Sequence, residues 1–283
     1  MRTFLFFIVA ALCIGVLVMG NLHWQSKLTA AGIEGKQEQE KIQLREREAK
    51  EARIQSLDPN LHPSQTLIDY LLYKALTQQH VVIAVVGSDG AAGSGASHPA
   101  NTWPELLEKG LRAEFPELEN LRFIARGYEG YTTTDFINSG KINDIIPEQP
   151  DLVIFETALL NNYHQSIGLE QTVNEMETLV SSLQMGLPNA KIILLSPNPI
   201  INSENKNNLK QTYLDYVNAS TEKIMEKKWS YINSHEKILT KIDEDNIVLA
   251  DIMTSDRLHL NDGGHSLWFQ IIMDFLKNDR LEK

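Results

Sequence analysis

The sequence has 283 residues, which is enough for one α/β domain of roughly 200 residues and an N-terminal extension. Hydrophobic residues make up 42% and charged residues 22%, a composition that excludes disordered and fibrous proteins. The 37 acidic residues outnumber the 26 Lys and Arg, giving a net charge of -11, so we expect no nucleic-acid partner, since such a partner requires a basic face.

The chain begins with an apolar segment that is long enough to span a membrane. Residues 3–20 carry no charge, and together with residues 21–24 they reach the roughly 20 residues that cross a bilayer core. No small-x-small cleavage pattern follows directly, so residues 1–26 are expected to be an uncleaved anchor rather than a signal peptide. A short N-terminal tail before a large domain then predicts a single-pass protein of the cell membrane with an extracytoplasmic C-terminal domain. The alternative is a secreted protein.

The single cysteine, Cys13, lies within this apolar segment, so the folded part has no disulfide. The residues before Cys13 match a lipid-attachment pattern poorly. Residues 27–62 then form a charged linker, in which Glu and Lys or Arg recur three or four positions apart and favour a helix. Its apolar positions keep no heptad, which favours a solvated spacer over a coiled coil. Pro59 and Pro63 are expected to end this helix and open a globular domain over residues 63–283.

Helix and strand patterns alternate through the globular domain. A helical segment runs from Leu67 to about His80, and the continuous apolar run 81–86 predicts a strand that is buried on both faces. The further elements expected are strands at 121–125, 152–155, 191–195 and 229–232, and helices over 169–183, 209–224 and 267–275. Repeated βα units predict a three-layer α/β sandwich with a five-stranded parallel sheet. Its site should lie beyond the carboxyl ends of the strands.

Two segments at this edge carry residues suited to chemistry. The glycine-rich turn 87–97 follows the first strand, but it lacks the lysine of a P-loop and the glycine spacing of a dinucleotide site. The segment 256–268 (DRLHLNDGGHSLW) places Asp256 three residues before His259, at the mouth of the last helix. A carboxylate there can fix the tautomer of the imidazole and support its protonated form. The other candidate histidines, which show no metal-ligand spacing, are His98, His164, His235 and His265.

Taken together, these segments resemble the SGNH hydrolase family, the GDSL-like lipases and esterases. That family begins with GDSxTxG after its first strand and ends with DxxHPNxxG before its last helix. The resemblance covers roughly residues 80–275 in the same order, with Leu260 in place of the usual proline. It implies a flavodoxin-like fold, no cofactor, and hydrolysis of an ester or acetyl ester of a cell-envelope glycan or lipid. Protein partners cannot be read from the sequence.

The family's middle blocks carry over residue by residue. The segment 127–133 resembles the glycine block, so Gly130 would offer its backbone N–H to an oxyanion. The segment 159–162 resembles GxND, although Leu159 and Asn162 depart from it, so Asn161 would donate its side-chain amide to the same oxyanion. Taken singly, Gly130 could instead serve a turn and Asn161 could cap a helix. Tyr128 and Tyr131 could line a substrate cleft or simply pack.

The first block departs from the family at the position that attacks the substrate. Gly87 and Gly93 are six apart, as in GDSxTxG, so Ser88 falls on the family's aspartate and Asp89 on its nucleophilic serine. Three alternatives remain open. The site could be inactive, which would make the chain a membrane-tethered binding or scaffold protein of the cell envelope. Ser88 or Ser94 could attack with His259 as base. Asp89 could itself be nucleophile or base, although attack on an ester would give an anhydride.

Overall fold

The computed structural model describes residues 2–78 and 80–280, and it divides the chain into one unit up to Ser56 and a second from Leu57 onward. The first unit is a single helix, α1 (Arg2–Leu57). Its most apolar 18-residue window has a mean hydropathy of 2.6 and is not buried, so its length and composition suit a membrane span or a signal sequence. The helix continues through the charged segment and ends two residues before Pro59.

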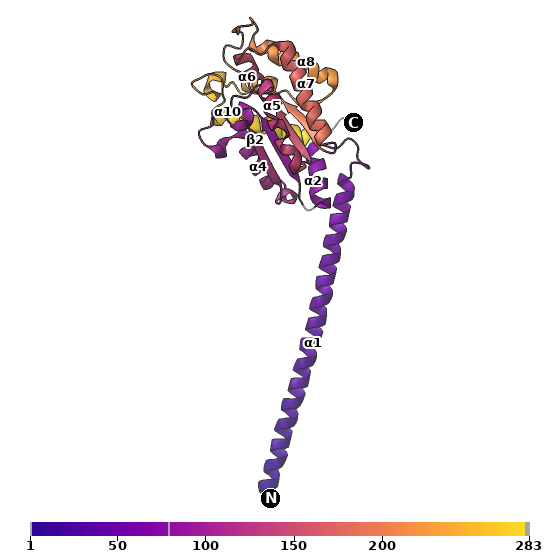
Figure 1. The fold of residues 1–283 in the computed structure, drawn as a ribbon. Coiled ribbons are helices and arrows are strands. Elements are labelled where there is room, and N and C mark those ends of the chain that lie inside the picture. Colours follow the sequence, from indigo (N-terminus) through magenta and orange to yellow (C-terminus); the bar gives the residue numbers. More distant parts are fainter. Residues whose placement is uncertain (1, 79, 281–283) are drawn as a thin grey trace. The chain divides into compact units, whose positions relative to one another are not determined.

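The second unit is built on a five-stranded sheet in the order β2-β1-β3-β4-β5, in which every neighbouring pair is parallel. Figure 1 shows the sheet surrounded by helices. The strands are β1 (Val82–Gly87), β2 (Arg122–Gly127), β3 (Leu152–Glu156), β4 (Lys191–Leu195) and β5 (Ser230–Ile232). Each lies within two residues of its predicted position. The predicted fold class, an α/β sandwich with a five-stranded parallel sheet, is therefore confirmed.

Helices cover both faces of the sheet because successive strand residues point to opposite sides. In β1, Ile83 and Val85 belong to one core cluster, whereas Val82, Ala84 and Val86 belong to the other. The first cluster packs under α2 (Leu67–Thr77), α4 (Trp103–Glu114), α9 (Ser234–Glu244) and α10 (Asp262–Asn278). The second packs under α5 (Thr133–Ser139), α7 (Leu169–Gly186) and α8 (Tyr213–Lys227). Burial on both faces explains why β1 reads as an unbroken apolar run.

Short elements fill the loops at the two ends of the sheet. They are α3 (Asp89–Ala92), α6 (Leu159–His164), and the 3-10 helices η1 (Pro99–Asn101), η2 (Pro116–Leu118), η3 (Lys141–Glu148) and η4 (Leu249–Ile252). Both α3 and α6 follow strands directly, β1 and β3 respectively. Their first residues therefore lie at the carboxyl edge of the sheet, where the site was expected.

Two helix boundaries differ from the prediction because of capping side chains. The helix expected from Leu209 begins at Tyr213, where Thr212 and Asp215 form a reciprocal capping box, and Leu209 itself is exposed. The closing helix begins at Asp262 rather than near Leu267, since the Asn261 side chain accepts hydrogen bonds from the first backbone N–H groups of α10. The apolar period alone misses the polar first turns of both helices.

Candidate active site

The turn after β1 is held tightly against the last helix. Asp89 is the first residue of α3 and Ser88 is its N-cap. A Cβ on Gly90 would lie 2.6 Å from the ring of Trp268, so only glycine allows the turn to pass this close to α10. Gly93 ends α3 in the left-handed region with φ 79, which glycine adopts without strain. The glycines of this segment thus serve a compact turn that presents Asp89 at the strand edge.

The two carboxylate oxygens of Asp89 contact different parts of the site. Oδ1 accepts a 2.6 Å hydrogen bond from the backbone N–H of Gly130. Oδ2 lies 3.5 Å from Nε2 of His259, an ion-pair distance that is longer than a good hydrogen bond. Asp89 is only 6% exposed, so its carboxylate fills the space between the glycine turn after β2 and the histidine.

His259 and Asp256 form the arrangement that their spacing suggested. His259 Nδ1 lies 2.7 Å from Oδ2 of Asp256, and the other oxygen of Asp256 accepts the backbone N–H groups of Leu258 and His259. Arg257 takes the left-handed conformation with φ 64, which folds the short segment back on itself. The hydroxyl of Thr254, His259 and these N–H groups outweigh burial and hold the pKa of Asp256 well below its usual range.

The charge state of this cluster follows from the two carboxylates around one imidazole. Asp89 and then Asp256 raise the pKa of His259 to about 9, although burial opposes the shift. Burial would raise the pKa of Asp89, but His259 and the Gly130 N–H outweigh it, so that this pKa lies below its usual value. At neutral pH the structure therefore holds an Asp89 carboxylate opposite a protonated His259. In that state the imidazole cannot accept a proton from a nucleophile.

Asn161 lies in α6 and closes the other side of the Asp89 turn. Its amide donates to Oγ of Ser88 at 2.7 Å and to the carbonyl of Tyr131 at 3.2 Å. Asn161 also helps to lower the pKa of Asp89, although its amide hydrogen bonds go to Ser88 and Tyr131. Ser88 is 1% exposed, and its hydroxyl is the acceptor of the Asn161 amide. The structure thus brings together Ser88, Asp89, Gly130, Asn161, Asp256 and His259, the whole predicted set.

One buried acid at this site escaped the sequence analysis. Glu156, the last residue of β3, is fully buried, and its Oε2 accepts a 2.7 Å hydrogen bond from the backbone N–H of Ser88. Burial raises the pKa of Glu156 to about 7 and the charge of Asp89 adds to the shift, whereas the N–H groups of Ser88, Ala91 and Ala158 oppose it. The available signal was an acid that directly ends an apolar strand run (LVIFE).

The remaining candidates are packing residues or lie at the margin of the site. Tyr128 and Tyr131 pack against each other and against Phe136 in the core under α5. His164 is exposed, and its pKa is lowered, first by partial desolvation and then by the charge of His259. His265, which was expected on the surface or in packing, is 1% exposed and packs against Trp268.

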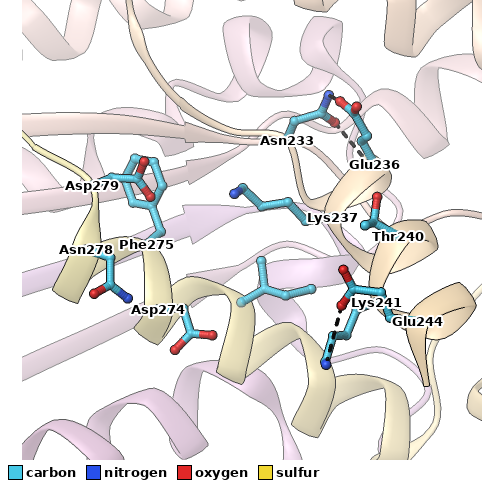
Figure 2. Close-up of a pocket in the computed structure, with 11 residues that line it drawn as sticks. Asn233, Glu236, Lys237, Thr240, Lys241, Glu244, Asp274, Phe275, Asn278 and Asp279 are labelled. Carbon is cyan, nitrogen blue, oxygen red and sulfur yellow. Dashed lines mark hydrogen bonds and ion pairs between the residues drawn. The ribbon is translucent and has the colours of Figure 1, made fainter.

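A groove lies elsewhere on the same unit, between α9 and α10, with a volume of about 540 Å³. Figure 2 shows residues that line it, among them Lys237, Lys241, Glu244 and Asp274. It contains none of the residues that gather around Asp89. The contacts drawn there are the hydrogen bonding between Asn233, the N-cap of α9, and Glu236, and the ion pair between Lys241 and Glu244. This groove is therefore separate from the Asp89 cluster.

The fold and this cluster define a three-layer α/β protein with a histidine–aspartate pair at the carboxyl edge of its parallel sheet. The family model of the GDSL-like lipases and acylhydrolases matches residues 85–267, so the chain belongs to that family. The matched segment begins in β1 and ends in α10, and it includes the whole Asp89 cluster. No curated protein matches the sequence closely enough to add to this assignment.

Solved structures share the fold at low sequence identity. A two-domain esterase active on acetylated mannans is 20% identical with a TM-score of 0.61, covering 77% of this chain but only 54% of its own. An acetyl-xylooligosaccharide esterase from Geobacillus stearothermophilus is 17% identical with a TM-score of 0.56, covering 72% of this chain and 97% of its own. A putative GDSL-like lipase from Parabacteroides merdae is 15% identical with a TM-score of 0.57. At these identities the likeness establishes the fold.

Proposed function

We propose that this chain is a membrane-tethered, cell-envelope member of the GDSL-like family in which Asp89 replaces the serine nucleophile, and that it binds a glycan or lipid ligand without cleaving acyl esters. The observation that carries the proposal is the 2.6 Å hydrogen bond from the Gly130 N–H to Asp89 Oδ1. An acyl-transfer enzyme uses such a donor for the oxyanion of its tetrahedral intermediate. Here the protein's own carboxylate occupies that donor and carries a negative charge of its own.

The protonation state supports the same conclusion. A serine hydrolase needs a neutral histidine that takes the proton of the attacking hydroxyl. With Asp89 in place, the pKa of His259 is about 9, so that the imidazole is already protonated at neutral pH. Ser88 is a weaker candidate for attack, since its hydroxyl is 1% exposed and is bonded to Asn161. Ser94 follows α3, and its carbonyl contacts His265.

One observation favours a second function, hydrolysis of an ester or acetyl ester. His259 Nδ1 lies 2.7 Å from Oδ2 of Asp256, the arrangement in which a carboxylate orients a histidine that acts as a base. The structural relatives include esterases of acetylated mannans and acetylated xylo-oligosaccharides, which supports an acetylated glycan as the ligand class under either function.

The apolar first part of α1 supports an anchor over residues 1–26, a linker over 27–62 and an extracytoplasmic domain over 63–283, with a cleaved signal as the alternative.

The test compares acyl-ester hydrolysis by the full chain in detergent with that of variants at one position. With 4-nitrophenyl acetate, we expect no turnover by the parent above the buffer rate. Asp89→Ser frees the oxyanion donor and lets His259 act as base, a contribution of about 10²–10⁴-fold. We therefore expect at least about 100-fold more activity from Asp89→Ser, and its loss again in Asp89→Ser/His259→Ala. Asp251→Ser, an exposed replacement of the same kind, is the matched control.

The outcomes separate the two functions. Turnover by the parent that disappears in His259→Ala establishes ester hydrolysis and refutes the binding proposal. Activity in Asp89→Ser alone supports a complete esterase frame with its nucleophile replaced. If Asp89→Ser stays as inactive as the Asp251→Ser control, Asp89 does not hold the nucleophile position and the proposal fails.

A further inference from the structure

The two carboxylate oxygens of Asp89 make different contacts, and the proposed absence of acyl-ester turnover does not explain this difference. Oδ1 is tied to the Gly130 N–H at 2.6 Å, whereas Oδ2 faces Nε2 of His259 at 3.5 Å. Nε2 has no hydrogen-bond partner among the described residues, although it is buried. One oxygen is therefore fixed in the oxyanion position, and the other faces an imidazole nitrogen with which it forms an ion pair but no hydrogen bond.

This asymmetry suits a carboxylate nucleophile for one kind of carbon and not for another. Attack on an acyl carbon would create a second oxyanion, for which the Gly130 donor is no longer free. Attack on a saturated carbon creates no oxyanion and gives an ordinary ester of Asp89, so Oδ1 stays where it is. Carboxylates form covalent intermediates of this kind in several classes of hydrolase.

The resulting ester would lie inside an esterase frame. Its carbonyl oxygen would be Oδ1, which already receives the Gly130 N–H, and its carbonyl carbon would lie beside His259. That dyad partner, Asp256, is in place at 2.7 Å. The residues that a family member would direct at an ester of its substrate are thus directed at the side chain of Asp89.

We propose that Oδ2 of Asp89 attacks an electrophilic saturated carbon that carries a leaving group, such as an epoxide or an alkyl halide, and that His259 and Asp256 hydrolyse the ester formed. This inference rests on the placement of Asp89 at the nucleophile position in the proposed function and adds a reaction to it. In the first step a C–O bond forms to Oδ2, the bond to the leaving group breaks with its electron pair, and the imidazolium of His259 gives its proton to the departing group or to the opened epoxide oxygen.

In the second step neutral His259 takes a proton from water, whose oxygen attacks Cγ of Asp89. The Cγ–O bond to the alkyl group breaks as His259 passes that proton to the departing oxygen, and the alcohol leaves. The new carboxyl group of Asp89 then gives its proton to His259, which restores the carboxylate and the protonated imidazole. The sum is R–X and water giving R–OH and HX for a halide, or an epoxide and water giving a diol, with no redox change. Esterification also prepares the base, because Asp89 is the main cause of the raised pKa of His259 and an ester carries no charge.

The test traps the ester on the full chain in detergent. Parent and His259→Gln are incubated separately with styrene oxide and with 1-bromobutane, and peptides are mapped by mass spectrometry. We expect His259→Gln to gain one alkyl group on the peptide that contains Asp89, and His259→Gln/Asp89→Asn to gain none there. In ¹⁸O-water with limiting electrophile, the parent should place the first ¹⁸O in the Asp89 carboxylate and not in the alcohol. Asp251, an exposed aspartate, reports non-specific alkylation.

Each result decides the matter. Labelling of Asp89 in His259→Gln that exceeds labelling of Asp251 by at least tenfold with either electrophile, together with ¹⁸O in Asp89 of the parent, supports the proposal, and the more reactive probe identifies the leaving group. Labelling of Asp89 that is less than tenfold above that of Asp251 with both probes, or ¹⁸O in the alcohol and not in Asp89 of the parent, overturns it. A gain of esterase activity in Asp89→Ser with no alkylation would overturn this inference alone. Absence of both would overturn the proposed function as well.

Discussion

The buried acid Glu156 offers a prediction whose magnitude follows from its position. Burial raises its pKa from 4.5 to about 7, so the folded chain holds a proton that the unfolded chain releases at lower pH. A group with a raised folded-state pKa stabilises the fold fully below its unfolded pKa, and this contribution is lost as the pH rises through the folded value. Integration between pH 5 and pH 8 gives a loss of about 2–3 kcal/mol for the parent.

The perturbation is Glu156→Gln, which keeps the shape and an oxygen that can accept the Ser88 N–H but cannot ionise. The free energy of unfolding would be measured by urea titration in detergent at pH 5, 6, 7 and 8, followed by near-ultraviolet circular dichroism. That signal reports the packing of Trp103 and Trp268, both fully buried. Between pH 5 and pH 8 the variant should lose about 2–3 kcal/mol less stability than the parent.

Glu222→Gln is the matched control, because Glu222 is an exposed glutamate on α8. Its pH profile should run parallel to that of the parent. If the profile of Glu156→Gln is also parallel to that of the parent, Glu156 does not hold a proton at neutral pH, and the account of burial beside Asp89 is refuted.

Two further substitutions test the electrostatics and the packing of the site. In Asp89→Asn the pKa of His259, followed by NMR of the imidazole, should fall from about 9 toward its ordinary value and remain above it because Asp256 is unchanged; an unaltered pKa would contradict the ion pair. Gly127→Ala would place a Cβ 2.2 Å from the backbone of Ala92, so we expect about 1–3 kcal/mol of destabilisation in urea unfolding. Gly168→Ala has only one neighbour, at 4.0 Å, and should stay close to the parent.

The sequence predicted the sheet well because burial on both faces leaves continuous apolar runs. The segments 81–86, 152–155 and 191–195 all coincide with central strands to within one residue. Helix starts were less predictable, since the first turn of α8 is set by the Thr212 and Asp215 side chains and that of α10 by Asn261. Such turns carry polar residues that the apolar period does not register.

The sequence predicted which residues form the site, but it did not predict their contacts and protonation states. Position in the motifs was enough to list Asp89, Gly130, Asn161, Asp256 and His259, which the fold brings together. The motifs could not indicate that Oδ1 of Asp89 would take the Gly130 N–H, because this depends on how far the turn after β2 reaches over the turn after β1. Glu156 was missed for a related reason, since an acid at a strand end is exposed or buried according to the turn that covers it.

The four ionisable groups of the site must be considered together, because replacing one changes the charge of the others. When Asp89 is ionised, its charge helps to raise the pKa of His259 to about 9 and that of Glu156 to about 7. An uncharged side chain at position 89 removes the main cause of the raised pKa of His259 and one cause of the raised pKa of Glu156. Both pKa values then fall, so His259 moves toward the neutral base and Glu156 toward the carboxylate. A single substitution, or an ester on Asp89, would thus convert a closed ion pair into the state in which a histidine–aspartate dyad can accept a proton. Asp256, at hydrogen-bond distance from His259, orients the imidazole in both states, but only in the second state can the pair accept a proton, and the proposed hydrolysis of an Asp89 ester depends on that state.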